Sequence, residues 1–132
     1  LAGEEIDPER LRRAAAAAAE GADAIVCEGV GGLLVPLAPG YLVRDLAADL
    51  GYPLVVVAAP GLGTINHTLL TIEAARAAGL EVAVVVLNPW PTRPSEIERD
   101  NRETIVSLAK VEVLTLPQVD LGDPDTWPQL RV

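Results

Sequence analysis

Continuous apolar runs recur along the chain and predict the strands of a buried sheet. Residues 53–59 read PLVVVAA and residues 81–87 read EVAVVVL, without the polar alternation of a strand that faces water on one side. Shorter apolar runs at residues 24–27 and 111–116 predict two more strands. We therefore expect four strands, of which residues 53–59 and 81–87 are buried on both faces.

Helix-forming stretches separate these runs. Asp7-Pro8-Glu9 offers a capping side chain, a proline at the first helical position and an acid in the first turn of an alanine-rich helix. Residues 43–50 predict a short helix, and we expect Thr64 to cap a third. Ser95 opens a fourth helix, because Glu98 stands three residues later and completes a capping box.

Helix and strand thus alternate four times, with connections too long for hairpins. This order predicts an α/β fold, a doubly wound parallel sheet with right-handed crossovers. Ligands of such sheets gather at the carboxyl ends of the strands. The strand ends here are Glu28-Gly29, Pro60-Gly61, Asn88-Pro89 and Pro117, so the functional residues are expected there.

Composition narrows the class of protein. The chain has 132 residues, 50% of them hydrophobic and 22% charged, which suits one folded domain. A net charge of −9 argues against a nucleic-acid partner, and no apolar run approaches the roughly 18–20 residues of a membrane span. One cysteine, Cys27, excludes a disulfide framework and is expected in the core. We expect a soluble, cytoplasmic protein.

The first residue adds an expectation about the extent of the domain. Methionine is absent from the sequence, and Leu1 stands where an initiator would. We expect residues 1–132 to be the C-terminal part of a single, longer domain.

Glu28 and the glycines after it form a candidate site for phosphate and metal. A carboxylate at a strand end can bind Mg²⁺ beside nucleotide phosphates, and Gly29, Gly31 and Gly32 would let backbone amides approach an anion. A strand-end acid followed by an ordinary turn explains the same residues equally well.

Two further strand ends carry polar groups. Residues 61–67 (GLGTINH) lead into a helix, whose free N–H groups suit an anion, although a tight turn explains the glycines as well. His67, the one histidine, has no matched partner in the sequence, which favours a structural or exposed role. Asn88 offers an amide that can pair with a purine edge, but asparagine is also a common turn residue.

Three stretches of the sequence together resemble dethiobiotin synthetase. They read VCEGVGGLLVPL at residues 26–37, GLGTINHTLLTIE at residues 61–73 and VVLN at residues 85–88. The second is the most distinctive, and the resemblance extends from about Ile6 to the proline-rich tail. It implies a P-loop NTPase-like fold and an ATP- and Mg²⁺-dependent ligase of biotin biosynthesis.

The resemblance also implies a reaction and a set of site residues. The ligase would join CO₂ or bicarbonate to 7,8-diaminononanoate, phosphorylate the carbamate and close a cyclic urea, within a homodimer whose second subunit supplies the helix after residue 63. Glu28 would bind Mg²⁺, and we assign no catalytic residue. The residues that would bind ATP are Glu28, Gly29, Val30, Gly31, Asn88, Pro89, Pro117, Gln118, Val119 and Asp125. The residues that would bind the diamine are Val30, Gly31, Val35, Leu62, Gly63, Thr64, Ile65 and Asn66.

The sequence departs from the family in its phosphate loop. The pattern G-x-x-x-x-G-K-[ST] is absent, as is a second Mg²⁺-binding aspartate, and Lys110 follows no glycine loop. We therefore expect the parent protein to catalyse the reaction and residues 1–132 alone to be inactive.

Three other interpretations remain open. A cobyrinate amidase shares the fold and the glycine-rich acid but requires a second, glutaminase domain. A shortened, non-catalytic paralogue would only dimerise and would not bind ATP. A generic flavodoxin-like binding domain leaves residues 61–67 unexplained.

Overall fold

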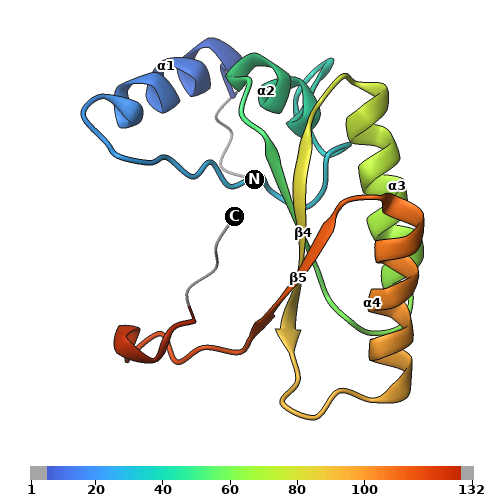
Figure 1. Ribbon diagram of the computed structural model, residues 1–132. Coiled ribbons are helices and arrows are strands. Elements are labelled where there is room, and N and C mark those ends of the chain that lie inside the picture. Colours follow the sequence, from blue (N-terminus) through green and yellow to red (C-terminus); the bar gives the residue numbers. More distant parts are fainter. Residues whose placement is uncertain (1–5, 129–132) are drawn as a thin grey trace.

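A computed structural model describes residues 6–128 of the chain (Figure 1). The elements in chain order are α1 (Pro8–Ala19), β1 (Pro36–Ala38), β2 (Tyr41–Leu42), α2 (Val43–Leu50), β3 (Leu54–Ala58), α3 (Thr64–Ala77), β4 (Val82–Trp90), α4 (Glu96–Ala109), β5 (Glu112–Pro117) and the short 3₁₀ helix η1 (Pro124–Thr126).

The main sheet is parallel, with the strand order β3-β4-β5. Val85 of β4 lies between Val56 of β3 and Val113 of β5, so the three strands are aligned side by side. Helices α3 and α4 connect the strands and lie side by side on the same face of the sheet (Figure 1). The α/β class and the parallel sheet with helical crossovers are therefore as predicted.

The core lies between this face and the two helices. Its buried residues from all five elements are Val56, Ile72, Val85, Leu87, Ile105, Ala109 and Val113. Residues Val84, Val85, Val86 and Leu87 are all buried, which confirms that β4 is covered on both faces. β3 differs, because Val55 and Val57 are 52% and 64% exposed. The expectation of two-sided burial is wrong for β3, an edge strand whose outer side chains have little cover among residues 6–128.

Residues 24–27 are not a strand, contrary to the sequence prediction. Val26 is 92% exposed and Cys27 is also exposed, so the expectation of a core cysteine is wrong as well. A strand is stable only when a neighbour completes its backbone hydrogen bonds, and no such neighbour lies beside this segment in the described part of the chain.

The helix starts show which capping residues act. Ser95 and Glu98 form the predicted capping box of α4, and hydrogen bonds from the Ser95 backbone N–H and hydroxyl lower the pKa of Glu98. The prediction that Thr64 caps helix α3 is wrong. The N-cap of α3 is Gly63, in the left-handed region at φ +88°, and Thr64 is the first helical residue.

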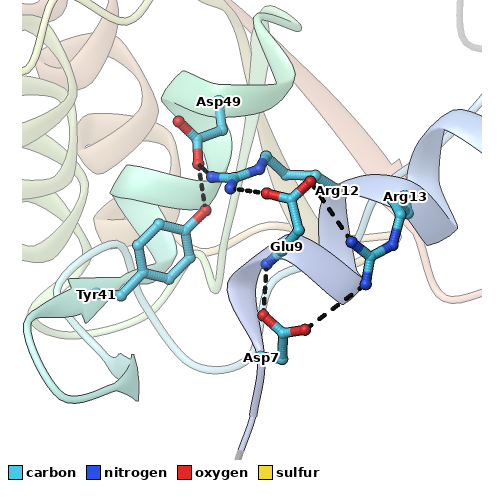
Figure 2. Close-up of polar contacts among 6 residues, drawn as sticks. All are labelled: Asp7, Glu9, Arg12, Arg13, Tyr41 and Asp49. Atoms are coloured by element: carbon cyan, nitrogen blue, oxygen red, sulfur yellow. Dashed lines mark hydrogen bonds and ion pairs between the residues drawn. The ribbon is translucent and has the colours of Figure 1, made fainter.

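Helix α1 is attached to the rest of the chain by polar contacts (Figure 2). None of its residues is buried. Arg12 forms a 2.5 Å ion pair with Asp49 of α2 and a second with Glu9, while the Tyr41 hydroxyl donates a 2.6 Å hydrogen bond to Asp49. Burial and this hydrogen bond raise the pKa of Tyr41 to about 12, and the contacts with Tyr41 and Arg12 lower the pKa of Asp49.

Within residues 6–128, no helix is both long enough and apolar enough to cross a bilayer.

Candidate functional site

The turn before α3 presents backbone donors. The Thr64 N–H donates to the Gly61 carbonyl at 3.2 Å, and the His67 N–H donates to the Gly63 carbonyl at 3.1 Å. The amides of Ile65 and Asn66 lie between these two and have neither a backbone acceptor nor a side-chain cap among the described residues. A helix start of this kind suits a carboxylate or phosphate oxygen.

An open groove of about 540 Å³ runs along the start of α3. Its lining includes four of the five residues predicted there to bind substrate, and the full set is Leu62, Gly63, Ile65, Asn66, Leu69, Leu70, Glu73 and Asn101. Thr64, the fifth, is buried and instead lines a smaller hollow of about 260 Å³ beside β3, together with His67. The groove is largely apolar along its length, with the two unpaired amides at one end.

A second group forms where β4 and β5 end. The Asn88 amide nitrogen donates to the carbonyls of Leu116 and Pro117 at 3.0 and 3.4 Å. Three residues predicted to bind ATP, Asn88, Pro89 and Pro117, are therefore brought together, and Gln118 and Val119 follow directly. These bonds use the Asn88 amide nitrogen within the protein, which leaves its oxygen as the atom that could face a ligand.

Asp125 lies in η1 and is exposed. In this turn the Gly122 N–H donates to the Asp120 carboxylate at 2.8 Å, and the Trp127 indole donates to the Asp120 carbonyl at 2.7 Å. Within the described range no hydrogen bond ties Asp125 to the Asn88 group, so its contact with a ribose remains a prediction.

The glycine loop after Glu28 is packed tightly against its neighbours. A Cβ at Gly29 would lie 2.9 Å from Val43 Cγ1, and one at Gly31 would lie 2.9 Å from Val35 Cγ2. The carbonyls of Leu33 and Val35 accept hydrogen bonds from the first amides of α2, at 2.9 and 3.0 Å. Two of these glycines are therefore required by packing, whatever ligand the loop binds.

Glu28 and Val30 are both exposed in this loop. Among residues 6–128, no group of three or more His, Cys, Asp or Glu side chains is placed to hold a metal ion. Mg²⁺ commonly takes one or two carboxylates and completes its shell with water and phosphate oxygens. Glu28 therefore fits as one ligand of a Mg²⁺ that nucleotide phosphates also bind, but not as a complete site.

The sequence interpretation missed Asn101. Its side-chain amide reaches from α4 to the carbonyls of Pro60 and Gly61, at 3.0 and 3.3 Å. Asn101 precedes the buried residues Ile105 and Ala109 by one and two helical turns, so it occupies the inward face of α4. The sequence did offer one indication, because Asn101 is a polar residue at the same four-residue spacing as Ile105 and Ala109.

Comparison with known proteins identifies the family. The family model described as an AAA domain (AAA_26) matches residues 1–124. The chain belongs to this family. The match agrees with the predicted P-loop NTPase-like α/β fold.

Several curated relatives carry the same name. The "ATP-dependent dethiobiotin synthetase BioD" of Rhodococcus erythropolis is 52% identical over 101 residues, which are 76% of this chain and 44% of the relative. The protein of the same name from Anaeromyxobacter sp. (strain K) is 47% identical over 117 residues, or 82% of this chain and 52% of the relative. The resemblance to dethiobiotin synthetase is confirmed, and the chain spans about half the length of these relatives.

Proposed function

We propose that this chain is part of an ATP-dependent dethiobiotin synthetase, a cytoplasmic ligase that converts 7,8-diaminononanoate, CO₂ or bicarbonate and ATP into dethiobiotin. The relatives' shared name supports the reaction. The observation that links this reaction to particular residues of the chain is the Gly61–Asn66 turn. It is the most distinctive stretch of the resemblance, and it leaves two amides unpaired at the end of a largely apolar groove.

The groove suits the acid end of this substrate. The Ile65 and Asn66 amides, at the positive end of α3, would bind the carboxylate of the diamine. Leu62, Leu69 and Leu70 line the groove and would contact the hydrocarbon chain that separates the carboxylate from the amines. Thr64 is buried, so its part would be to support the turn.

The nucleotide would be bound by the glycine loop after Glu28 and by the residues around Asn88. Glu28 would bind Mg²⁺ together with phosphate oxygens, and this ion would neutralise charge on the triphosphate. Backbone amides of Gly29, Val30 and Gly31 would lie beside the phosphates. Asn88 and the segment from Pro117 to Val119 would border adenine, and Asp125 would approach the ribose. The protein's contribution to the reaction is then to orient the groups and to balance their charge.

We propose a homodimer, in which the α3 groove of one subunit faces the nucleotide groups of the other. Leu62 lines the groove and is fully exposed, and no hydrogen bond links the Gly61–Asn66 turn to the Glu28 loop among the described residues. A second subunit would bring these groups together.

The sequence contains no G-x-x-x-x-G-K-[ST] loop, so binding of the triphosphate would require residues outside positions 1–132. The test compares the protein from the complete reading frame with residues 1–132, each supplied with ATP, Mg²⁺, bicarbonate and the diamine. We expect ADP and dethiobiotin in equal amounts from the complete protein and neither from residues 1–132. Failure of the complete protein to form dethiobiotin would refute the proposal.

A further inference from the structure

Asn101 connects helix α4 to the turn that precedes helix α3. It lies on the inward face of α4, while the turn that it contacts follows β3 and opens α3. It also lines the α3 groove, together with Gly63, Ile65 and Asn66. The Asn101 side chain therefore donates hydrogen bonds to the turn and also lines the groove.

The carbonyls that Asn101 contacts determine how α3 begins. Pro60 is buried, so its carbonyl needs a partner within the protein, and Asn101 supplies one at 3.0 Å. The Gly61 carbonyl accepts from Asn101 at 3.3 Å and also from the Thr64 N–H at 3.2 Å. The Gly61 carbonyl therefore accepts hydrogen bonds both from the first turn of α3 and from the Asn101 side chain on α4.

The geometry points to Asn101 as a positioning residue for the α3 groove. By fixing the Pro60 and Gly61 carbonyls, it sets the orientation of the Ile65 and Asn66 amides, and these would bind the substrate's carboxylate. The inference rests on the proposed function for the identity of that ligand. It does not require Asn101 itself to touch the reacting atoms.

Two substitutions separate positioning from general stability. Asn101→Asp preserves the size of the side chain but places carboxylate oxygen against two carbonyl oxygens, and Asn101→Leu removes the donor without adding charge. Glu103→Gln is the matched control, because Glu103 is an exposed residue of the same helix. All three are made in the protein from the complete reading frame.

The first readout is amide hydrogen exchange, measured at the start of α3 and in β4. We expect both Asn101 variants to accelerate exchange of the Thr64 and His67 amides by about tenfold, because these amides close the turn that Asn101 holds. Exchange in β4, over the buried residues Val84 to Leu87, should not change. Unchanged exchange at Thr64 and His67 would overturn the inference, and so would acceleration that extends equally to β4.

The second readout is steady-state kinetics. We expect Asn101→Asp to raise KM for the diamine by about tenfold, with kcat and the KM for ATP within about twofold of wild type. Glu103→Gln should match wild type in every parameter. An unchanged KM for the diamine, with the turn loosened, would overturn the positioning role. If the wild-type complete protein forms no dethiobiotin, the proposed function fails, and the exchange data then decide alone whether Asn101 positions the turn.

Discussion

The side-chain amide of Asn88 donates a 3.0 Å hydrogen bond to the carbonyl of Leu116 and thereby joins the carboxyl ends of β4 and β5. Backbone pairing in this region shifts register between Leu87 and Trp90, so the side chain bridges the strands where the regular ladder is interrupted. Asn88 therefore has a structural task in addition to its proposed contact with adenine.

Replacing Asn88 with alanine should lower the free energy of unfolding by about 1–2 kcal/mol, because a partly buried carbonyl loses its donor. Urea denaturation measures this change. Gln118→Ala, at an exposed position near the same edge, is the control and should leave the midpoint in place. Equal midpoints for Asn88→Ala and wild type would show that the hydrogen bond adds nothing.

Glu28→Gln should lower the turnover of the protein with little change in its free energy of unfolding. Glu28 is exposed and forms no ion pair or hydrogen bond within residues 6–128, so the free energy of unfolding should change by less than about 0.5 kcal/mol. Turnover of the complete protein should fall at least about tenfold, since the amide is a poor Mg²⁺ ligand. Glu20→Gln, another exposed acid, should retain wild-type turnover. Wild-type turnover in Glu28→Gln would remove Glu28 from the proposed site.

The glycine loop offers a matched pair of substitutions. Gly31 has φ +74° and little room beside Val35, whereas a Cβ at Gly32 meets nothing within 4 Å. Gly31→Ala should cost about 1–2 kcal/mol from the backbone alone and loosen the loop, while Gly32→Ala should be nearly neutral. Hydrogen exchange at Val35, Val43 and Arg44 reports the loop directly. Equal exchange in both variants would contradict this account.

Tyr41 should titrate at high pH. In a Tyr52→Phe variant of residues 1–132, Tyr41 is the remaining tyrosine, and its phenolate absorbance should appear with a midpoint near pH 12. Because the folded-state pKa is raised, the stability that neutral Tyr41 contributes is complete below about pH 10 and is lost as the pH rises through about 12.

Asp49→Asn should lower the Tyr41 midpoint only in part, because burial is the largest single cause of the raised pKa and remains in the variant. Arg10→Gln, at an exposed position of α1 outside the cluster in Figure 2, serves as the control. A Tyr41 midpoint near pH 10 in the parent variant would mean that in solution the hydroxyl is neither shielded from water nor hydrogen-bonded to Asp49.

Local chemistry was enough to predict most elements of the fold. The capping box of Ser95 and Glu98 and the apolar run of β4 depend on neighbouring residues and on burial, and both are confirmed. Residues 24–27 have the same apolar character, but pairing depends on a partner strand that no local pattern reveals. Thr64 was expected to cap α3 because its hydroxyl suits that task, yet Gly63 adopts the left-handed backbone that the turn requires.

The site was predicted unevenly for the same reason. Sequence motifs pointed to Asn88 and to the Gly61–Asn66 turn, because these stand near the end of a strand and at a helix start. They pointed to Glu28 only because it follows residues 24–27, a predicted strand that the structure does not form. They did not reveal the bond between Asn101 and Pro60, which joins residues 41 positions apart. Nor did they show that the Asn88 amide nitrogen is already engaged by β5.

The close approach of Gly29 to Val43 has a consequence for the divergence of these proteins. With 2.9 Å between a would-be Cβ and the valine methyl, the two positions share one small volume. Descendants of this sequence can gain a side chain at position 29 only while position 43 becomes smaller, so a larger residue at 29 should be inherited together with a smaller one at 43.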